Sequence, residues 1–264
     1  MMAWIKANKV AFFYIVACLL AWSIGGLMIA RRFGLVDVPG WPHYLTGLGP
    51  AAAALLTAAL TGDLRDLLAR ITRWRFGGVW WLVVLSPLLL FAVAAPIQWI
   101  ITGEPPALAG LGNVEDIGQI GVVGAALLWL ATFGFGEETG WRGFAQHHLQ
   151  QAHGARRTAL IVGVLWIVWH LPYFFYQSTF MSFGVLGTVG WSIGLVAGAV
   201  VLAWLYNGTG QSILAVALWH ALFNLASAAP GSEVVLAPAM SVAVIGAAII
   251  LRRVEANRAA EAPA

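Results

Sequence analysis

The chain has 264 residues, of which 9% are charged and 61% apolar, and its mean hydropathy is +0.84. Because a soluble domain carries about 25% charged residues, this composition excludes a soluble globular enzyme, a disordered chain and a coiled coil. Apolar segments of roughly 17 to 22 residues without two-residue alternation favour membrane helices over a barrel. The net charge of +3 gives no indication of a nucleic-acid partner. We therefore predict an all-α, polytopic transmembrane bundle that forms a single membrane domain over residues 1–264.

The predicted spans follow one another with short connections. Eight are predicted, at residues 10–30, 44–60, 79–101, 118–147, 157–176, 184–205, 211–228 and 233–251. The Pro/Gly-rich stretch 102–117 is typical of an external loop. The polar, Ala-rich tail 254–264 is expected to be loose. In the sixth span, glycines at 190, 194 and 198 recur every four residues and predict close packing against a neighbouring helix.

The positive charges are distributed unevenly along the chain. With both termini in the cytoplasm, twelve lysines and arginines lie on the inner side or reach it, against Arg31 and Arg32 outside. The inner set is Lys6, Lys9, Arg65, Arg70, Arg73, Arg75, Arg142, Arg156, Arg157, Arg252, Arg253 and Arg258. This asymmetry and an even number of spans predict cytoplasmic termini. The Ala/Gly/Trp-rich composition indicates a prokaryotic protein, hence a multi-pass protein of the cell membrane.

Polar side chains inside the apolar segments are the candidate functional residues. Each ionisable group at mid-depth costs roughly 2.5–3.5 kcal/mol, so such groups are functional by default. The set consists of Glu137, Glu138, Arg142, His170, His220 and Asn224. With a rise of 1.5 Å per residue, three different spans bring Glu137, His170 and His220 to about 14–20 Å from the inner boundary. This shared depth predicts one common site.

Helical spacing separates the two neighbouring glutamates. Glu138 and Arg142 are four residues apart with the acid first, the favoured order for an ion pair. Glu137 is turned away by about 100°, which leaves its carboxylate for another partner. By the same four-residue spacing, the pairs that share a helix face are Trp166 with His170 and His220 with Asn224.

A carboxylate and two imidazoles permit two kinds of hydrolytic chemistry. The carboxylate can deprotonate a water that one histidine orients, while the second histidine and the Asn224 amide stabilise an oxyanion. Alternatively, Glu137, His170 and His220 can bind zinc, with a water as the fourth ligand. The residues leave both readings open. An intramembrane aspartyl pair and an H-E-x-x-H helix are absent from the sequence.

The order and spacing of these residues follow a known pattern. The motifs are E-E-x-x-x-R at Glu137, Glu138 and Arg142, W-x-x-x-H at Trp166 and His170, and H-x-x-x-N at His220 and Asn224. Together with the stretch NGTGQSILAVALWHALFN, they resemble the CAAX protease and bacteriocin-processing family of intramembrane proteases, which includes the Ras-converting enzymes. The resemblance covers about residues 120–228.

The resemblance implies a role for each matching position. Glu137 with His170 would activate water, and His220 with Asn224 would form the oxyanion site. Glu138, Arg142 and Trp166 would support them; the family often has Phe where this chain has Trp166. A glutamate-type protease without a cofactor is favoured, with zinc as the alternative.

The resemblance also implies the partners. We expect membrane lipid and a membrane-associated peptide or lipidated protein, such as a prenylated CAAX-type substrate. Two other functions stay open. One is a non-catalytic scaffold or bacteriocin immunity factor, since prokaryotic relatives are linked to self-immunity. The other is a proton-coupled transporter, because Glu/His chains also conduct protons, although no inverted repeat is present.

Overall fold

A computed structural model describes residues 1–261, and the side chains of residues 1–254. The fold is nearly all α-helical, as predicted. The α-helices are α1 (Met2–Ala7), α2 (Lys9–Arg32), α3 (Gly49–Thr61), α4 (Leu64–Ile71), α5 (Gly78–Val84), α6 (Ser86–Thr102), α7 (Gly121–Trp129), α8 (Glu138–Gly140), α9 (His147–Trp169), α10 (Ser178–Ser182), α11 (Gly184–Gly208), α12 (Ile213–Ser227) and α13 (Leu236–Glu261).

Shorter elements complete the chain. The 3₁₀ helices are η1 (Trp41–Leu48), η2 (Leu108–Gly112) and η5 (Leu171–Phe175), and the π-helices are η3 (Leu130–Glu137) and η4 (Trp141–Gln146). Strands β1 (Asn113–Val114) and β2 (Gly118–Gln119) form a small antiparallel hairpin, in which β1 lies in the predicted external loop and β2 at the first residues of the predicted span 118–147. Helix α13 continues to Glu261, so residues 254–261 of the expected loose tail are helical, and residues 262–264 lie outside the described part.

The helices are those of a multi-pass membrane protein, but the predicted count of eight spans is not confirmed. Five helical segments are long and apolar enough to cross a membrane, or six if α5 and α6, bent by 43°, form one span. Two features account for the difference. Residues Gly121–Phe175 form one helical segment of 55 residues, where two spans were predicted. Helix α12, at 15 residues, is also short for a span.

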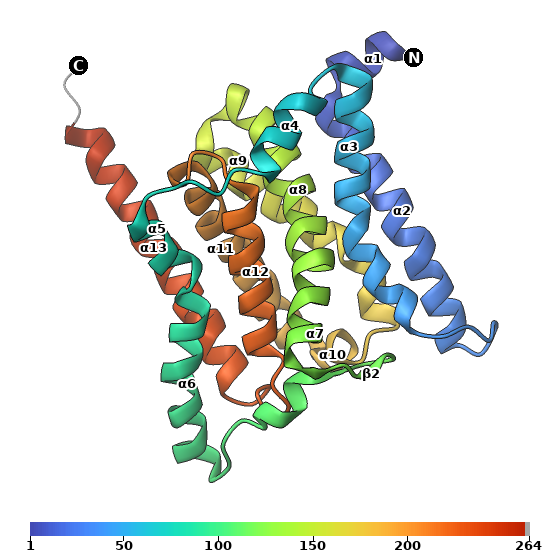
Figure 1. Ribbon diagram of the computed structural model, residues 1–264, viewed down its shortest axis with the longest axis vertical. Coiled ribbons are helices and arrows are strands. Elements are labelled where there is room, and N and C mark those ends of the chain that lie inside the picture. The colour runs from blue at the N-terminus through green and yellow to red at the C-terminus, as the bar shows by residue number, and fades with distance from the viewer. Residues whose placement is uncertain (262–264) are drawn as a thin grey trace.

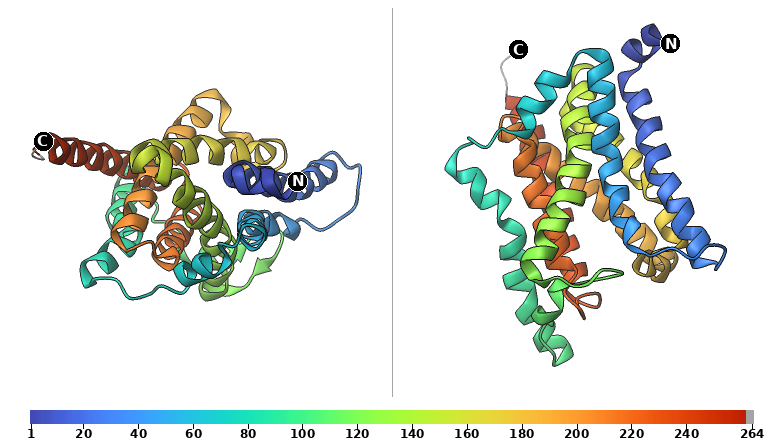
Figure 2. Two further views of the ribbon diagram at one scale, coloured as in Figure 1. Left: turned by 90° about the horizontal axis from the view of Figure 1, so that it is seen from above. Right: turned by 45° about the vertical axis from the view of Figure 1, so that its right-hand side comes forward.

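The segment that bears the first two motifs lies at the centre of the bundle. Helices α2 and α3 pack together on one side, and α6 and α13 on the opposite side, with α7 and α12 between them (Figures 1 and 2). In the segment Gly121–Phe175, 50% of the most apolar 18-residue stretch is buried, whereas the corresponding share is only 17% in Leu236–Val254 of α13. The start of α1 and the end of α13 lie at the same end of the bundle (Figure 1).

A turn at Gly154 brings the second motif back to the first. Gly154 has φ 67° and ψ 166°, a conformation that favours glycine, and it interrupts α9. The chain rises through α7 and η4 to this turn and descends through the rest of α9 (Figure 1). His170 therefore returns to the level of Glu137.

Close backbone packing occurs around the first motif and not along the predicted glycine stripe. A Cβ at Gly190 or Gly198 would meet nothing within 4 Å, so the prediction of tight packing there is wrong. At Gly194 a Cβ would lie 3.9 Å from the Cβ of Ser241 in α13, which is an ordinary contact, and the closer approach of α11 is to α9, where Gly163 meets Val196 and Ala199.

The glycines of the motif segment make the close contacts. A Cβ at Gly136 would lie 2.4 Å from the Gly47 carbonyl oxygen, and one at Gly140 would lie 2.5 Å from the Cβ of Pro50. On the other side, a Cβ at Gly134 would lie 2.8 Å from the carbonyl oxygen of Ala217 in α12. The motif segment is thus wedged between η1–α3 and α12, which fixes the depth of the glutamates.

These contacts predict a difference between two alanine substitutions. Gly136→Ala forces the Gly47 backbone to move, so we expect a loss of about 1–3 kcal/mol in unfolding free energy. Gly190→Ala has free space and gains helix propensity, so its stability should stay the same or rise. Thermal unfolding of both variants in the same detergent measures the difference, and equal melting temperatures would contradict the packing described.

Candidate active site

The first motif lies in irregular helix. Glu137 ends the π-helix η3, Glu138 begins the single turn of α8, and Arg142 lies in the second π-helix, η4. Such π-helical turns are rare and often occur at functional sites. Predictions based on an ideal α-helix did not anticipate them. The one signal in the sequence is the glycine-rich composition of FGFGEETGWRGF.

Glu138 joins the first and third motifs. Its Oε1 accepts hydrogen bonds from Arg142 Nη1 and from His220 Nδ1, each at 2.8 Å. Both Glu138 and Arg142 are fully buried, so this ion pair is shielded from water. The predicted pairing with Arg142 is confirmed. The bond to His220, which comes from a distant part of the sequence, was not predicted.

Glu137 is held by the second motif. It is 3% exposed, and its Oε2 accepts a hydrogen bond from the indole Nε1 of Trp166 at 2.5 Å. Within the described residues, no hydrogen bond is made by Oε1. The Glu137 carboxylate, for which helical spacing predicted a partner other than Arg142, is thus oriented by Trp166. Its second oxygen, Oε1, is still able to accept a proton.

His170 and His220 are both hydrogen-bonded through Nδ1, which leaves Nε2 of each ring unbonded in the described part of the chain. His170 Nδ1 lies 2.7 Å from the carbonyl oxygen of Trp166. Because a carbonyl only accepts, Nδ1 carries the proton and Nε2 keeps a free lone pair in the neutral ring. The Glu138 carboxylate imposes the same tautomer on His220. Each imidazole therefore offers Nε2 for chemistry.

Trp166 is in contact with every charged or titratable group of the cluster except Glu138. The Arg142 guanidinium lies over its ring, 4.5 Å from the centroid. The His220 ring meets it edge-on, with centroids 5.3 Å apart. The structure therefore brings together six of the seven predicted site residues, namely Glu137, Glu138, Arg142, Trp166, His170 and His220.

Asn224 is the seventh. It lies one turn beyond His220 on α12 and is partly buried. Its side chain makes no hydrogen bond to the described residues, so the amide is available to a ligand.

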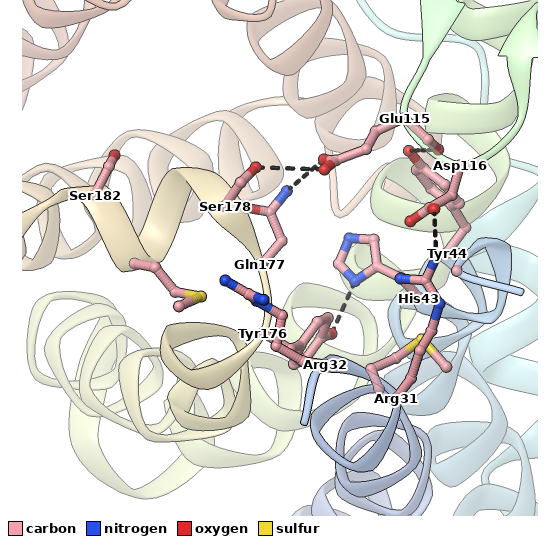
Figure 3. Close-up of a pocket in the computed structure, with 13 residues that line it drawn as sticks. Arg31, Arg32, His43, Tyr44, Glu115, Asp116, Tyr176, Gln177, Ser178 and Ser182 are labelled. Atoms are coloured by element: carbon pink, nitrogen blue, oxygen red, sulfur yellow. Dashed lines mark hydrogen bonds and ion pairs between the residues drawn. The ribbon is translucent and has the colours of Figure 1, made fainter. Parts of the chain in front are cut away.

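A cavity of about 530 Å³ opens near the site, at the end of the bundle opposite the termini (Figure 3). Its walls include Arg32 and His43, and none of the seven predicted residues lines it. The His43 ring lies 5.1 Å from that of Tyr173, which lies 5.2 Å from that of His170. His43 lies within η1, just before the predicted span 44–60, so it was not among the polar side chains inside the apolar segments.

The side chains do not form a ready zinc site. In the part of the chain that the structure describes, no three His, Cys, Asp or Glu side chains are placed to hold one metal ion. Glu137 and His170 are directed to Trp166, and His220 to Glu138. These bonds engage Glu137 Oε2 and the two Nδ1 atoms, and they leave Glu137 Oε1 and both Nε2 atoms unbonded within the described residues.

Comparison with known proteins supports the motif assignment. Residues 119–226 match the family model described as "Type II CAAX prenyl endopeptidase Rce1-like". This part of the chain is thus similar to the Rce1-like proteins. The match contains all three motifs and nearly coincides with the 120–228 region of the predicted resemblance, which is thereby confirmed.

One curated relative is similar to this region. "CAAX prenyl protease 2" of Methanococcus maripaludis is 28% identical over 103 residues, which cover 38% of this chain and 37% of the relative. The chain thus matches a little over a third of that protein's length.

The buried Glu138–Arg142 pair predicts a strong effect on stability. Glu138→Gln leaves a buried guanidinium without its counter-charge, which costs about 3–5 kcal/mol. The double variant Glu138→Gln/Arg142→Met removes both charges and should recover part of this loss. The control is Asp63→Asn, whose partner Lys9 is 27% exposed and whose loss should cost about 1 kcal/mol or less. Unfolding in detergent measures all three, and a double variant less stable than Glu138→Gln would contradict the pairing.

Proposed function

We propose that the protein is an intramembrane endopeptidase that hydrolyses a peptide bond in a membrane-associated substrate, with lipidated CAAX-type tails as the first class to test. The observation that carries this proposal is the buried cluster in which the Glu137 carboxylate lies with two histidines that present Nε2. Further support comes from the Rce1-like match and from the multi-pass helical fold.

In the proposed first step, Glu137 is the general base. Its Oε1 takes a proton from a water, while Oε2 stays bonded to the Trp166 indole. His170 accepts a second hydrogen bond from this water at Nε2 and so orients it toward the scissile carbonyl carbon. Positioned bases of this kind typically contribute 10²–10⁴-fold to the rate, as an order-of-magnitude range.

In the next steps, His220 and Asn224 stabilise the tetrahedral oxyanion. Glu138 accepts a hydrogen bond from His220 Nδ1–H. For Nε2 to donate to the oxyanion as well, His220 takes up a second proton from solvent before this step and keeps it throughout. The Asn224 amide donates from one turn away. Glu137 then returns its proton to the leaving amine, and the peptide bond breaks without a covalent intermediate. Buried, preorganised donors are effective because they need no reorientation during the reaction.

We further propose that the enzyme is of the glutamate type. Glu137 is already engaged by a neutral N–H donor and His220 by a carboxylate, which suits acid–base chemistry. The zinc alternative requires Glu137 and both imidazoles to converge on one point, and no three such side chains are placed to do so in the described residues.

Glu137→Gln tests the reaction. The amide cannot take a proton, so cleavage of a prenylated Cys-aliphatic-aliphatic-X peptide by protein in liposomes should fall at least about 100-fold. Glu104→Gln, in the exposed loop after α6, is the control and should cleave normally. EDTA should leave the wild-type rate unchanged. Wild-type cleavage by Glu137→Gln would overturn the proposal, and loss in EDTA with rescue by zinc would favour the metal alternative.

We also propose that both termini face the cytoplasm of a prokaryotic cell, on the strength of the charge distribution. Cys18 is the chain's one cysteine, so a Cys18→Ser background allows single-site labelling. With an impermeant maleimide on intact cells, Glu104→Cys should be labelled, whereas His153→Cys should be labelled only after lysis. The reverse pattern would invert the topology.

A further inference from the structure

The residue that holds Glu137 differs from the one that the resembling family often has. A phenylalanine at position 166 would supply a ring but no hydrogen-bond donor, whereas Trp166 donates its indole N–H to Glu137 Oε2. We propose that Trp166 is a positioning residue whose N–H orients the Glu137 carboxylate for proton transfer. This inference rests on the proposed function.

The hydrogen bond is short, buried and made to a carboxylate. The donor–acceptor distance is 2.5 Å, and the two residues are 6% and 3% exposed. Hydrogen bonds to ionised groups are shorter and about twice as strong as those between neutral groups. With little competing water, the indole fixes which carboxylate oxygen stays free to act as the base.

The indole itself has little freedom to move. One face of its ring carries the Arg142 guanidinium, and the His220 ring lies against it edge-on. Arg142 is in turn bonded to Glu138. The position of Nε1, and therefore that of the Glu137 carboxylate, is set by contacts from all three motifs.

Trp166 also fixes the orientation of His170, the second group that contacts the water in the proposed reaction. Its carbonyl oxygen accepts a hydrogen bond from Nδ1–H of His170. Glu137 and His170 make no direct hydrogen bond in the described residues, so one residue determines the space between the carboxylate and the imidazole. A water must fit that space to be activated. Loss of the indole N–H frees the carboxylate while leaving His170 in place.

The test uses matched Trp→Phe substitutions. Trp166→Phe keeps a ring and removes the donor, so kcat should fall about 10- to 100-fold, the range for loss of a hydrogen bond to a charged group. KM should stay within about twofold, because the buried indole positions the base rather than the substrate. The decline in kcat on the acid side should also begin at higher pH, since the carboxylate has lost a donor that stabilised it.

Trp141→Phe is the control. Trp141 is fully buried, and its indole N–H has no partner among the described residues. Its ring packs against those of Phe13 and Trp169. The substitution should lower thermal stability as other core changes do while leaving kcat and its pH profile unchanged. Equal loss of kcat in both variants, or wild-type kcat in Trp166→Phe, would overturn the proposal.

A second measurement does not require cleavage. In a double-mutant cycle of unfolding, Trp166→Phe and Glu137→Ala should be non-additive, because each removes the same hydrogen bond. The coupling should reach about tenfold or more in the unfolding equilibrium constant, as expected for a bond to a charged group. Additive losses would refute the positioning contact. If the wild-type protein cuts no probe but the coupling is present, the proposed function fails while the contact stands.

Discussion

The Glu138 carboxylate is the group on which the rest of the site depends. It is fully buried, and a charge in such a place is tolerated only when it is paired and hydrogen-bonded. Arg142 supplies the counter-charge from the next turn, and His220 supplies the second donor from α12. The remaining face of the guanidinium is covered by Trp166. Compensating one charge thus draws in residues from all three motifs.

This arrangement separates the roles of two adjacent glutamates. Glu138 accepts hydrogen bonds from Arg142 and His220 on one oxygen and holds the helices together, whereas Glu137 accepts one hydrogen bond from a neutral indole N–H. Because the π-helical turns re-aim successive side chains, the two carboxylates reach different partners although they are neighbours in sequence. The same irregular helix needs glycine on its flanks, where Gly136 and Gly140 meet the backbone of η1 and α3.

Local spacing explains which features could be predicted. The Glu138–Arg142 pair is an i,i+4 contact, and the apolar runs identify a helical membrane bundle from composition alone. The three motifs were also recognisable from order and spacing. The bond between Glu138 and His220 and the indole bond to Glu137 depend on how distant helices pack, and no pattern within one helix encodes them.

Two predictions that the structure does not confirm have a similar cause. The stripe at Gly190 and Gly198 has the right period for close packing, but whether a neighbour lies on that face is decided by the tertiary fold. The count of eight spans is not confirmed when helix length and hydropathy are the criteria. A turn at Gly154 inside one helical segment and the short α12 do not fit those criteria.

The position of His220 on α12 has a consequence for biogenesis. A ribosome releases the glutamates and His170 together, as one helical hairpin folded about Gly154, well before His220 emerges. During this interval Glu138 already has Arg142 within reach, so this charge pair can form before α12 is made. The proposed hydrolytic centre, however, still lacks one of its two imidazoles. On the proposed function, a truncated product ending before α12 would lack both oxyanion donors, His220 and Asn224.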